Sequence, residues 1–417
     1  MRKGSLWKKI ASACVAAMLL STVPASVYAE EPQTDAAGTN MIKRLRVGDA
    51  QIVDEGAVTG ETYPGVTYNA ETNTLTFNNA DIKGTDENNR GVVFVEGYDE
   101  GYNEITIELT GENTIAFEEA LPDDYPWALL ELTCCSKVTL KGSGTLNLAG
   151  RENVRNGFIF SYGGSNADNR AELILDGCAL NIDSGDMDAD DWFMGIHGCY
   201  GMDLKLKSAE LNITADSDEM SVFQGILGDA AHEEGKDVTI HAEYSKLYVS
   251  GSGEGRYGID TLAGAEFINS DVRLAFPGEN SFPVFAANGK DCNIGIDEST
   301  TFTWIQTDNW SYYLEGGDII FDIQDSSYIY TGEYADGPWS LADTKDEAFG
   351  RDDQGRMNIW KNFMISPEKL EEDIRGDING DGYVNMNDST LCLKHIADQG
   401  TLTGEQLKAA DLNGDSV

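Results

Sequence analysis

Alternating apolar and polar residues recur along most of the chain in short runs that come in pairs. In one pair, Val138-Thr139-Leu140 is followed after a turn by Leu146-Asn147-Leu148, and in the next pair Leu173-Ile174-Leu175 is followed by Leu180-Asn181-Ile182. Each run has the period of two that is typical of a β-strand with one buried face. The last apolar residue of the first strand recurs at intervals of 27 to 35 residues, at Phe77, Leu109, Leu140, Leu175, Leu206, Ile240, Phe267, Ile296 and Ile323. A third short strand is expected 16 to 21 residues after each of the first eight, at Val93, Leu129, Ile159, Ile196, Ile226, Ile259, Val284 and Tyr313.

These three-strand units predict a right-handed parallel β-helix of about nine rungs over residues 42–335. One rung cannot bury its own inward side chains, whereas stacked rungs share a continuous aliphatic interior. A β-sandwich is the alternative, but its strands recur every ~8–12 residues without a longer unit. Because an open end exposes unpaired backbone, residues 42–68 are predicted to cap the N-terminal end, and residues 336–374 are interpreted as a C-terminal cap and linker.

The first 29 residues have the composition of a secretory signal peptide. Four basic residues precede an apolar run, and Val27-Tyr28-Ala29 supplies a small-residue cleavage site. Residues 30–41 are polar or small and are predicted to be a disordered linker. No later stretch is long and apolar enough for a membrane span. We therefore expect a secreted protein, extracellular or held at the cell surface.

The charge of the chain excludes some classes of partner. It contains 72 acidic and 29 basic side chains, a formal net charge of −43. Without the signal peptide, which has four basic and no acidic residues, 25 basic and 72 acidic side chains remain, a net charge of −47. Nucleic acid and anionic membranes repel such a surface, whereas divalent cations, Ca²⁺ above all, are natural counter-ions.

A different pattern begins at residue 375. Its first twelve-residue loop has the oxygen-bearing residues and the glycine, Gly382, of a calcium loop. The predicted side-chain ligands are Asp377, Asn379, Asp381, Asn385 and Asp388, and the carbonyl of Tyr383 supplies a further oxygen. A helix is expected over residues 389–397 and a short helix over 405–410. A second loop begins with the predicted ligands Asp411, Asn413 and Asp415.

Two such loop starts, with Asp388 at position 12 and no helix entering the first loop, resemble a type I dockerin over residues 375–417. The resemblance implies Ca²⁺ binding and docking to a cohesin module of a scaffold protein in a cellulosome-type complex. It also implies that Met386, Asn387 and Lys394 help to select the cohesin. The second repeat is expected to be incomplete: either the sequence is a fragment, or this copy cannot form the two-fold symmetric module. A calcium loop that only rigidifies the tail is the alternative.

The loops between the second and third strands of the rungs are expected to line one edge of the rod and are acidic. The run 183–191 is the best candidate for a further calcium site there, with Asp186, Asp188 and Asp190 as ligands. A solvated acidic face that keeps the protein soluble is an equally good interpretation. Aromatic rings on this edge are candidates for stacking on sugars, although packing against the rod is an alternative for each. They are Trp192, Tyr125, Trp127 and Tyr257.

Parallel β-helices also carry polysaccharide-cleaving enzymes, so the chain can be compared with their sites. Asp190-Asp191 and His197 lie too close in sequence to fall on successive rungs, which argues against a polygalacturonase-like site. A lyase needs an arginine or lysine as base, and Arg151, Arg155 and Arg256 on the acidic edge leave this possibility open. No nucleophile elbow or zinc-protease motif is present. The prediction leans against an enzyme, with a polysaccharide lyase or glycoside hydrolase as the alternative and a purely adhesive protein as a third class.

The cap, the segment from Tyr68 to Thr76 and the Leu-Asn-Ile rungs are similar to secreted carbohydrate-binding β-helix proteins of cellulosome-producing anaerobes over residues 42–335. This resemblance implies calcium binding and a plant cell-wall polysaccharide as ligand. The combined prediction is an accessory protein of polysaccharide degradation, with a β-helix that binds the polymer and a dockerin that binds a scaffold.

Overall fold

The protein is described by a computed structural model. Its described residues are 42–84, 91–98, 103–117, 128–150, 156–161, 170–185, 192–215, 222–228, 236–252, 256–278, 281–286, 291–306, 319–324, 327–332, 339–342, 362–369, 378, 386–397, 400–403, 406–407 and 410.

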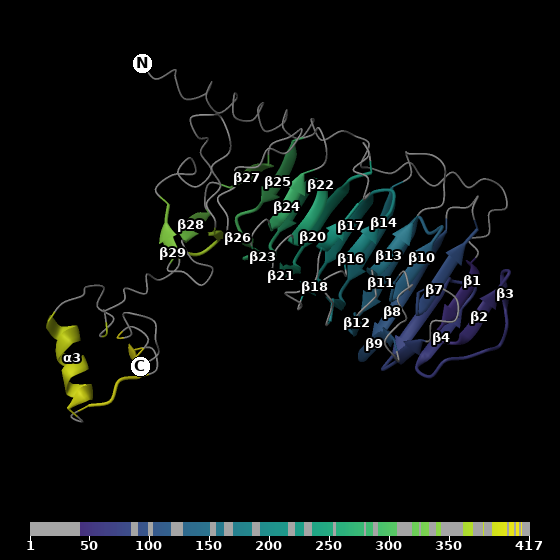
Figure 1. Ribbon diagram of the computed structural model, residues 1–417, viewed down its shortest axis with the longest axis horizontal. Helices are drawn as coiled ribbons and strands as arrows, with labels where there is room; N and C mark the ends of the chain where they lie inside the picture. Colours follow the sequence, from purple (N-terminus) through teal and green to yellow (C-terminus); the bar gives the residue numbers. More distant parts are fainter. Residues whose placement is uncertain are drawn as a thin grey trace, which may run out of the picture.

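The described strands form a β-solenoid whose strands stack in three parallel ladders (Figure 1). The first ladder contains β5 (Thr74–Asn78), β8 (Glu104–Thr110), β11 (Lys137–Gly142), β14 (Ala171–Asp176), β17 (Met202–Lys207), β20 (Val238–Glu243), β22 (Arg256–Ile268), β25 (Cys292–Ile296) and β27 (Ile319–Ile323). The second contains β7 (Val93–Gly97), β10 (Leu130–Thr133), β13 (Asn156–Ser161), β16 (Trp192–Gly198), β19 (Val222–Leu227), the start of β22 and β24 (Phe282–Ala286). The third contains β6 (Asp81–Gly84), β9 (Glu112–Phe117), β12 (Thr145–Ala149), β15 (Ala179–Asp183), β18 (Glu210–Ala215), β21 (Lys246–Gly251), β23 (Asp271–Phe276) and β26 (Thr301–Gln306). The predicted parallel β-helix is therefore confirmed.

Inward side chains of the first ladder lie above one another in a continuous column, as the repeat predicts. The column runs through Leu75, Ile107, Leu140, Leu175, Leu206, Ala242, Phe267, Ile296 and Ile323, all of them buried. Three of the residues chosen from the repeat lie in neighbouring columns, two residues away. Leu109 pairs with Phe77 and Gly142, and Ile240 pairs with Leu204 and Ala265. A shift of two residues leaves a side chain on the same face of its strand, so these residues still point inward.

The second ladder differs from the prediction at two positions. Val93 pairs with Leu130, and Leu130 pairs with Phe158, so Leu129 and Ile159 were each one residue away from the stacked position. Tyr313 lies outside the described residues. From β13 to β22 this ladder is marked by a glycine directly before the stacked residue, at Gly157, Gly195, Gly225 and Gly258. No glycine precedes Val93, Leu130 or Val284. A Cβ atom at Gly195 would lie 2.5 Å from Cγ2 of Ile213, so the glycines make room for the aliphatic side chains of the third ladder.

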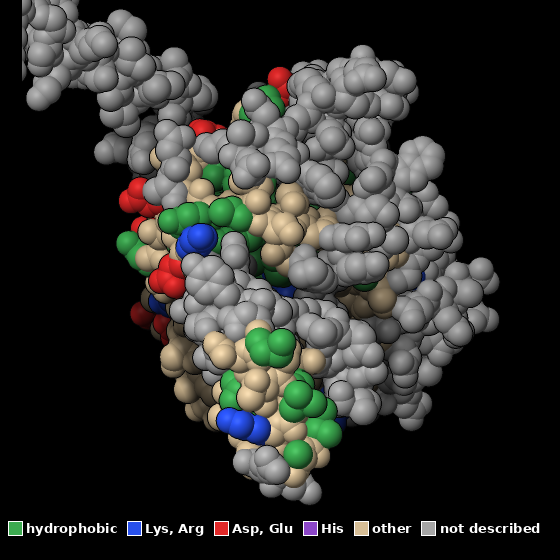
Figure 2. All heavy atoms as spheres, turned by 90° about the vertical axis from the view of Figure 1, so that its left-hand side faces the viewer, with side chains coloured by type: hydrophobic (Ala, Val, Ile, Leu, Met, Phe, Trp, Pro, Cys, Tyr) green, Lys and Arg blue, Asp and Glu red, His purple; other side chains and the backbone are tan. Residues whose placement is uncertain are grey.

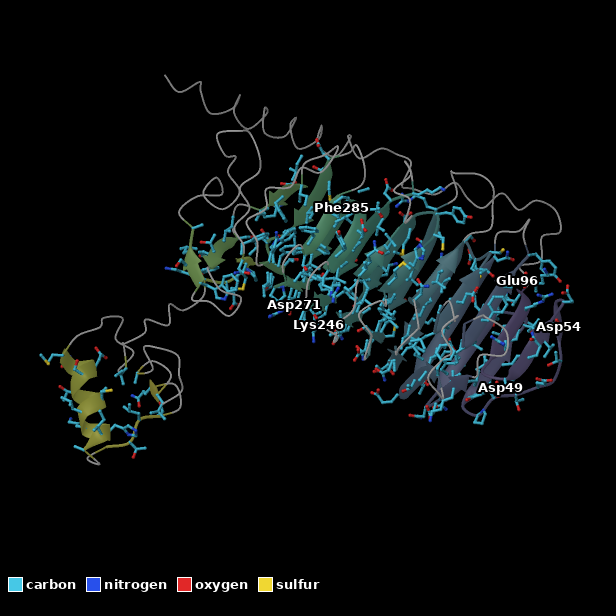
Figure 3. All side chains as sticks on the ribbon, viewed as in Figure 1. Asp49, Asp54, Glu96, Lys246, Asp271 and Phe285 are labelled. Atoms are coloured by element: carbon cyan, nitrogen blue, oxygen red, sulfur yellow. The ribbon has the colours of Figure 1, made fainter. Side chains whose placement is uncertain are left out.

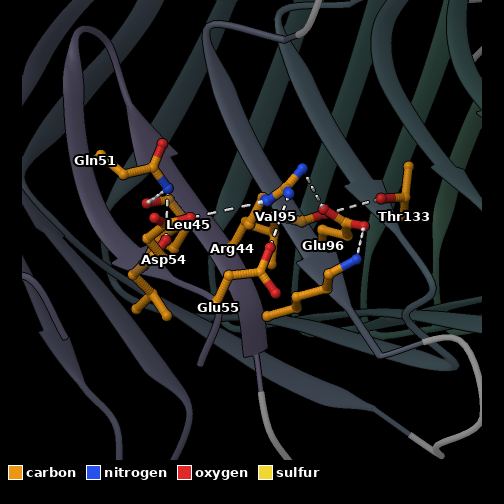
Figure 4. A network of polar contacts seen from close by, with 10 residues as sticks. Arg44, Leu45, Gln51, Asp54, Glu55, Val95, Glu96 and Thr133 are labelled. Carbon is orange, nitrogen blue, oxygen red and sulfur yellow. Dashed lines mark hydrogen bonds and ion pairs between the residues drawn. The ribbon is translucent and has the colours of Figure 1, made fainter. Parts of the chain in front are cut away.

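Antiparallel strands cover the N-terminal end of the solenoid. β1 (Ile42–Val47) pairs with β2 (Ala50–Asp54) and β7, β2 pairs with β3 (Ala57–Val58), and β4 (Val66–Asn69) pairs with β5. Glu96 on β7 holds two of the three basic residues of β1, because its carboxylate lies 3.0 Å from Nζ of Lys43 and 3.5 Å from Nη1 of Arg44 (Figure 4). Arg44 also donates to Glu55 at 2.8 Å.

Tyr63 covers the exposed edge of β6 with a single hydroxyl group. The hydroxyl accepts from the backbone N–H of Lys83 at 3.0 Å and donates to the carbonyl of Asp81 at 3.2 Å. It thereby supplies both hydrogen bonds that a further strand would have made at this point. At the other end, β26 pairs antiparallel with β30 (Asn362–Ser366), which pairs with β28 (Tyr328–Gly332), and β28 pairs with β29 (Trp339–Leu341).

The cysteines of the rod serve mainly as small apolar residues. Cys135, Cys178 and Cys292 are buried, and none of the cysteines within the described ranges forms a disulfide. Burial raises the pKa of the Cys135 and Cys292 thiols to about 12, which keeps them protonated. The helix α3 (Met386–Ile396) follows the rod and starts three residues before the predicted position. In the part of the chain that the structure covers, no helix has the length and apolarity needed to cross a lipid bilayer.

Candidate functional site

Among the predicted calcium ligands of the C-terminal module, Asp388 lies within the described residues. It lies in the first turn of α3 and is only 2 % exposed. A carboxylate loses its hydration on burial and needs a partner or a cation in exchange. Asp388 therefore lies out of solvent at the start of α3, where the sequence predicts position 12 of the loop. The other predicted ligands of this module, Asp377, Asn379, Asp381, Tyr383, Asn385, Asp411, Asn413 and Asp415, lie outside the described residues.

The short helix predicted near residue 405 has a recognisable start. The N–H of Thr403 donates to Oε1 of Gln406 at 2.9 Å, and the N–H of Gln406 donates to Oγ1 of Thr403 at 3.3 Å. This reciprocal pair is a capping box, and residues 406 and 407 are helical.

One face of α3 is apolar and exposed. Met386, Leu393 and Ile396 are 78 %, 65 % and 75 % exposed, and their spacing places them on one side of the helix. Figure 2 shows hydrophobic side chains gathered on the surface of the part of the molecule that carries α3. Asn387 and Lys394, the other two residues predicted to choose the partner, are also exposed. Apolar groups gathered on the surface of a small module are typical of a protein interaction site.

The fold and this module together define a β-solenoid protein with a C-terminal docking module. The family model described as "Dockerin type I domain" matches residues 375–417, so the C-terminal segment is a type I dockerin. Type I dockerins bind calcium, and a dockerin implies a cohesin as partner in a cellulosome-type protein. No curated protein and no solved structure matches the chain.

Most of the predicted loop edge of the rod lies outside the described residues. This applies to Asp186, Asp188, Asp190, Tyr125 and Trp127, and for Trp192 only the backbone at the start of β16 is described. Within the described ranges, no three histidine, cysteine or acidic side chains form a metal-binding group.

Tyr257 packs against the aromatic side chains of the rod itself. Its ring centroid lies 5.4 Å from that of Phe282 and 6.3 Å from that of Phe285. Burial and the charge of Asp260 raise the pKa of Tyr257. The Tyr257 ring is therefore in contact with side chains of the rod, which favours packing over sugar stacking for this residue.

Arg256 is not at the surface of the acidic edge, contrary to the sequence-based expectation. It is fully buried, and its Nε donates to the carbonyl of Ser252 at 3.0 Å. A side chain without solvent exposure does not meet a polymeric substrate, so Arg256 is not the base of a lyase. Arg151 and Arg155 lie outside the described residues.

The outer face of the third ladder carries a column of carboxamides that sequence reasoning did not single out. Nδ2 of Asn212 donates to Oδ1 of Asn181, and Nδ2 of Asn181 donates to Oδ1 of Asn147, each at 2.8 Å. The repeated triplet of leucine, asparagine and an aliphatic residue is the signal that could have revealed it, because residues at the same triplet position stack in a solenoid.

At β21 and β23 the same face becomes charged and aromatic. Nζ of Lys246 lies 3.3 Å from Oε2 of Glu210, and Tyr248 donates its hydroxyl hydrogen to Asp271. The hydrogen bond from Asn212 and the charge of Lys246 hold the pKa of Glu210 below its ordinary value. Burial and the carboxylate of Asp271 raise the pKa of Tyr248, so its hydroxyl remains a donor.

The outer face of the first ladder is a set of ion pairs between neighbouring strands. Lys141 lies 2.9 Å from Glu108, and Glu172 lies between Lys137, at 3.4 Å, and Lys205. Burial acts to raise the pKa of Glu172, but the hydrogen bonds and charges of the two lysines outweigh it and hold the pKa below 4.5. Lys137, Lys141 and Lys205 on this face thus pair with carboxylates of the rod itself.

Proposed function

We propose that this is a secreted accessory protein of plant polysaccharide degradation. Its dockerin, residues 375–417, binds a cohesin of a scaffold protein in a calcium-dependent way, and its β-solenoid, residues 42–335, binds cell-wall polysaccharide. Residues 1–29 direct secretion and are removed.

The observation that carries the docking half is the exposed face of α3 within a segment that matches the dockerin family. Met386, Leu393 and Ile396 gain most from being covered by a partner, because burial of apolar surface is the main favourable term in protein association. Lys394 and Asn387 flank these residues and add polar contacts that choose among cohesins.

Calcium fits the first loop of the module. Asp377, Asn379, Asp381, Asn385 and Asp388 would supply side-chain oxygens, and Tyr383 would supply its carbonyl. A bound calcium ion neutralises the carboxylates and holds the loop against the start of α3. The burial of Asp388 supports this assignment, because that carboxylate is already turned away from solvent.

Polysaccharide binding is supported by the length of the solenoid and by the polar groups on its faces. A stack of parallel strands presents the same kind of side chain at a spacing of about 4.8 Å, which suits a polymer with repeating hydroxyl groups. The lyase alternative needs an accessible basic residue, and Arg256, the candidate base within the described residues, is buried.

The test is retention of the mature chain on immobilised type I cohesin and on insoluble plant polysaccharides. Cohesin binding is expected in calcium and is expected to vanish in EDTA, in Asp381→Ala and in Asp388→Ala. Met386→Asp should lose cohesin binding without losing calcium, whereas Val58→Asp, an exposed apolar residue on β3, should bind as the parent does. Cohesin binding that survives EDTA contradicts the docking proposal, and absence from every polysaccharide contradicts the binding proposal.

A further inference from the structure

The column of asparagines on the third ladder has hydrogen-bonding capacity that the rod does not use. A carboxamide has two N–H donors and two lone pairs on its oxygen. Asn181 uses one donor toward Asn147 and one lone pair toward Asn212. One donor and one lone pair of Asn181 therefore remain for an outside ligand. The internal bonds also hold the carboxamides in one orientation, so little side-chain freedom remains to be lost on binding.

The strip beside this column contains small side chains on β12 and β15 and has carboxylates at its margin. Glu112 pairs with Thr145 and accepts from Asn147 at 3.4 Å, and Asp183 is the next outward residue after Asn181. The outward positions of β12 and β15 next to the asparagines are Thr145 and Ala179, and the alternating burial of both strands keeps these small side chains at the surface. On β18 and β21 the equivalent positions are Glu210 and Lys246, which neutralise one another in an ion pair of 3.3 Å. The chain as a whole has a net charge of −43. This strip is therefore a part of the surface where an uncharged ligand finds polar partners, and an anionic one meets the general repulsion of the protein.

Tyr244 stands at the corner where the chain enters β21, and its conformation is unusual. The φ angle of Tyr244 is 51°. The equivalent corners of other coils also have positive φ, 72° at Gly177, 47° at Ser208 and 44° at Asn269. Glycine and asparagine adopt this left-handed conformation readily, whereas a bulky side chain adopts it at a cost. Tyr244 is nevertheless aromatic and 59 % exposed. A ring that contributes so little to packing at a position of backbone strain is a candidate for ligand contact.

Figure 3 places this region on its own side of the rod. Lys246 and Asp271, on adjacent strands, are labelled along the lower margin, and Phe285, which belongs to the aromatic group around Tyr257, is labelled on the upper margin. The strip thus lies on a different side of the rod from Tyr257 and its aromatic neighbours.

We propose that an extended, neutral polysaccharide chain binds along the strip formed by Asn147, Asn181, Asn212, Thr145 and Ala179, with one sugar ring stacked on Tyr244. The inference rests on the proposed polysaccharide-binding function and names its site and ligand class. Asn147 and Asn181 each keep one N–H and one lone pair for sugar hydroxyls. Asn212 donates to both Asn181 and Glu210 and offers the sugars a lone pair only. Tyr244 offers its flat face to the C–H groups of a ring, and Tyr248 keeps its hydroxyl engaged with Asp271.

The experiment is affinity electrophoresis of the mature chain in native gels that contain a neutral or an anionic polymer. Hydroxyethylcellulose and carboxymethylcellulose share one backbone and differ in charge, and xyloglucan and glucomannan extend the neutral set. Retardation is expected in at least one neutral gel and should be weaker in carboxymethylcellulose than in hydroxyethylcellulose. Tyr244→Gly and Asn181→Ala should each weaken binding about tenfold, the effect of losing one well-placed contact.

The variants separate binding from folding. Tyr244→Gly relieves the left-handed strain, so its melting temperature should equal or exceed that of the parent. Tyr200→Gly removes another exposed tyrosine, 45 % exposed on the turn after β16, and should bind like the parent. If the parent is retarded but Tyr244→Gly and Asn181→Ala are retarded equally, the site is wrong and the general function stands. If none of the neutral polymers retards the parent, the inference is overturned, and if no polysaccharide of any charge does, the proposed polysaccharide function falls with it.

Discussion

Nε of Arg170 donates to Oδ1 of Asp203 at 2.9 Å and so joins the coil that begins at β14 to the coil that begins at β17. The same guanidinium reaches the carbonyl of Met202 at 2.9 Å and the carboxylate of Asp237, one coil further along. One side chain therefore ties three consecutive coils together. The contact with Asp237 adds a link across two coils to the backbone ladders, which join each coil only to its neighbours.

Replacing Arg170 by methionine should lower the free energy of unfolding by about 2 kcal/mol, since the nearly buried carboxylate of Asp237 loses a charged donor. Thermal and urea unfolding followed by circular dichroism measure the change. Arg44→Met is the matched control, because Arg44 pairs with Glu55 and Glu96 at the surface and its side chain is 45 % exposed. Equal effects of the two substitutions would show that the buried staple has no special role.

Removing the hydroxyl of Tyr63 should open the edge of β6. Tyr63→Phe keeps the ring and leaves the N–H of Lys83 and the carbonyl of Asp81 to solvent, which should cost about 1 kcal/mol. An open edge is also a template for pairing with a second chain. Light scattering should therefore detect more self-association in Tyr63→Phe than in Tyr98→Phe, a control at another partly exposed tyrosine. Unchanged stability and unchanged self-association would show that the Tyr63 hydroxyl does not protect the edge of β6.

The glycine series of the second ladder should tolerate no side chain. A Cβ at Gly195 would lie 2.5 Å from the carbonyl oxygen of Gly225 and 2.5 Å from Cγ2 of Ile213. Gly195→Ala should lower the free energy of unfolding by about 1–3 kcal/mol, as overpacking of a core does. Gly295→Ala, where the nearest atom lies 3.8 Å away, should be close to neutral. The comparison of the two melting temperatures is the measurement, and equal values would contradict the steric explanation.

Acid should weaken the ion pairs of the first ladder. The pKa of Glu172 is lower in the folded protein than its ordinary value of 4.5, so its stabilising contribution is present above pH 4.5 and is lost as the pH falls through the folded pKa. Glu172→Gln removes this titration. Its free energy of unfolding should fall less steeply between pH 5 and pH 3 than that of the parent, within the range that reference carboxyl pKa values of about 4 define. Parallel pH profiles of the two proteins would falsify the assignment.

The fold was predictable because it depends on a repeat that is visible in sequence. Leu140, Leu175 and Leu206 were recognised as equivalent and pair directly in the first ladder. Leu129 and Ile159 were misplaced by one residue, because buried residues stand next to one another in that ladder and alternation cannot tell which of them points inward. A glycine precedes Phe158 and so marks it, whereas none precedes Leu130. The meaning of such a glycine depends on packing, as that of Ile213 against Gly195 shows.

The functional module was predictable for a different reason. A calcium loop is a local arrangement in which ligand spacing alone identifies the site, so the sequence of residues 375–417 is sufficient to recognise the dockerin. The candidates on the rod were less well chosen. Arg256 is of a residue type that usually lies at the surface, but it is buried. The asparagine column is hard to see in sequence because no single asparagine stands out within its own coil.

The sequence by itself determined the architecture of parallel coils and the dockerin, because both follow from spacings along the chain. Only the tertiary structure decided which side chains of different coils meet. Asn147, Asn181 and Asn212 are more than 30 residues apart in succession and become neighbours through the register of β12, β15 and β18. A register is set by the packing of all inward side chains together, and a shift of one residue would turn every asparagine into the core.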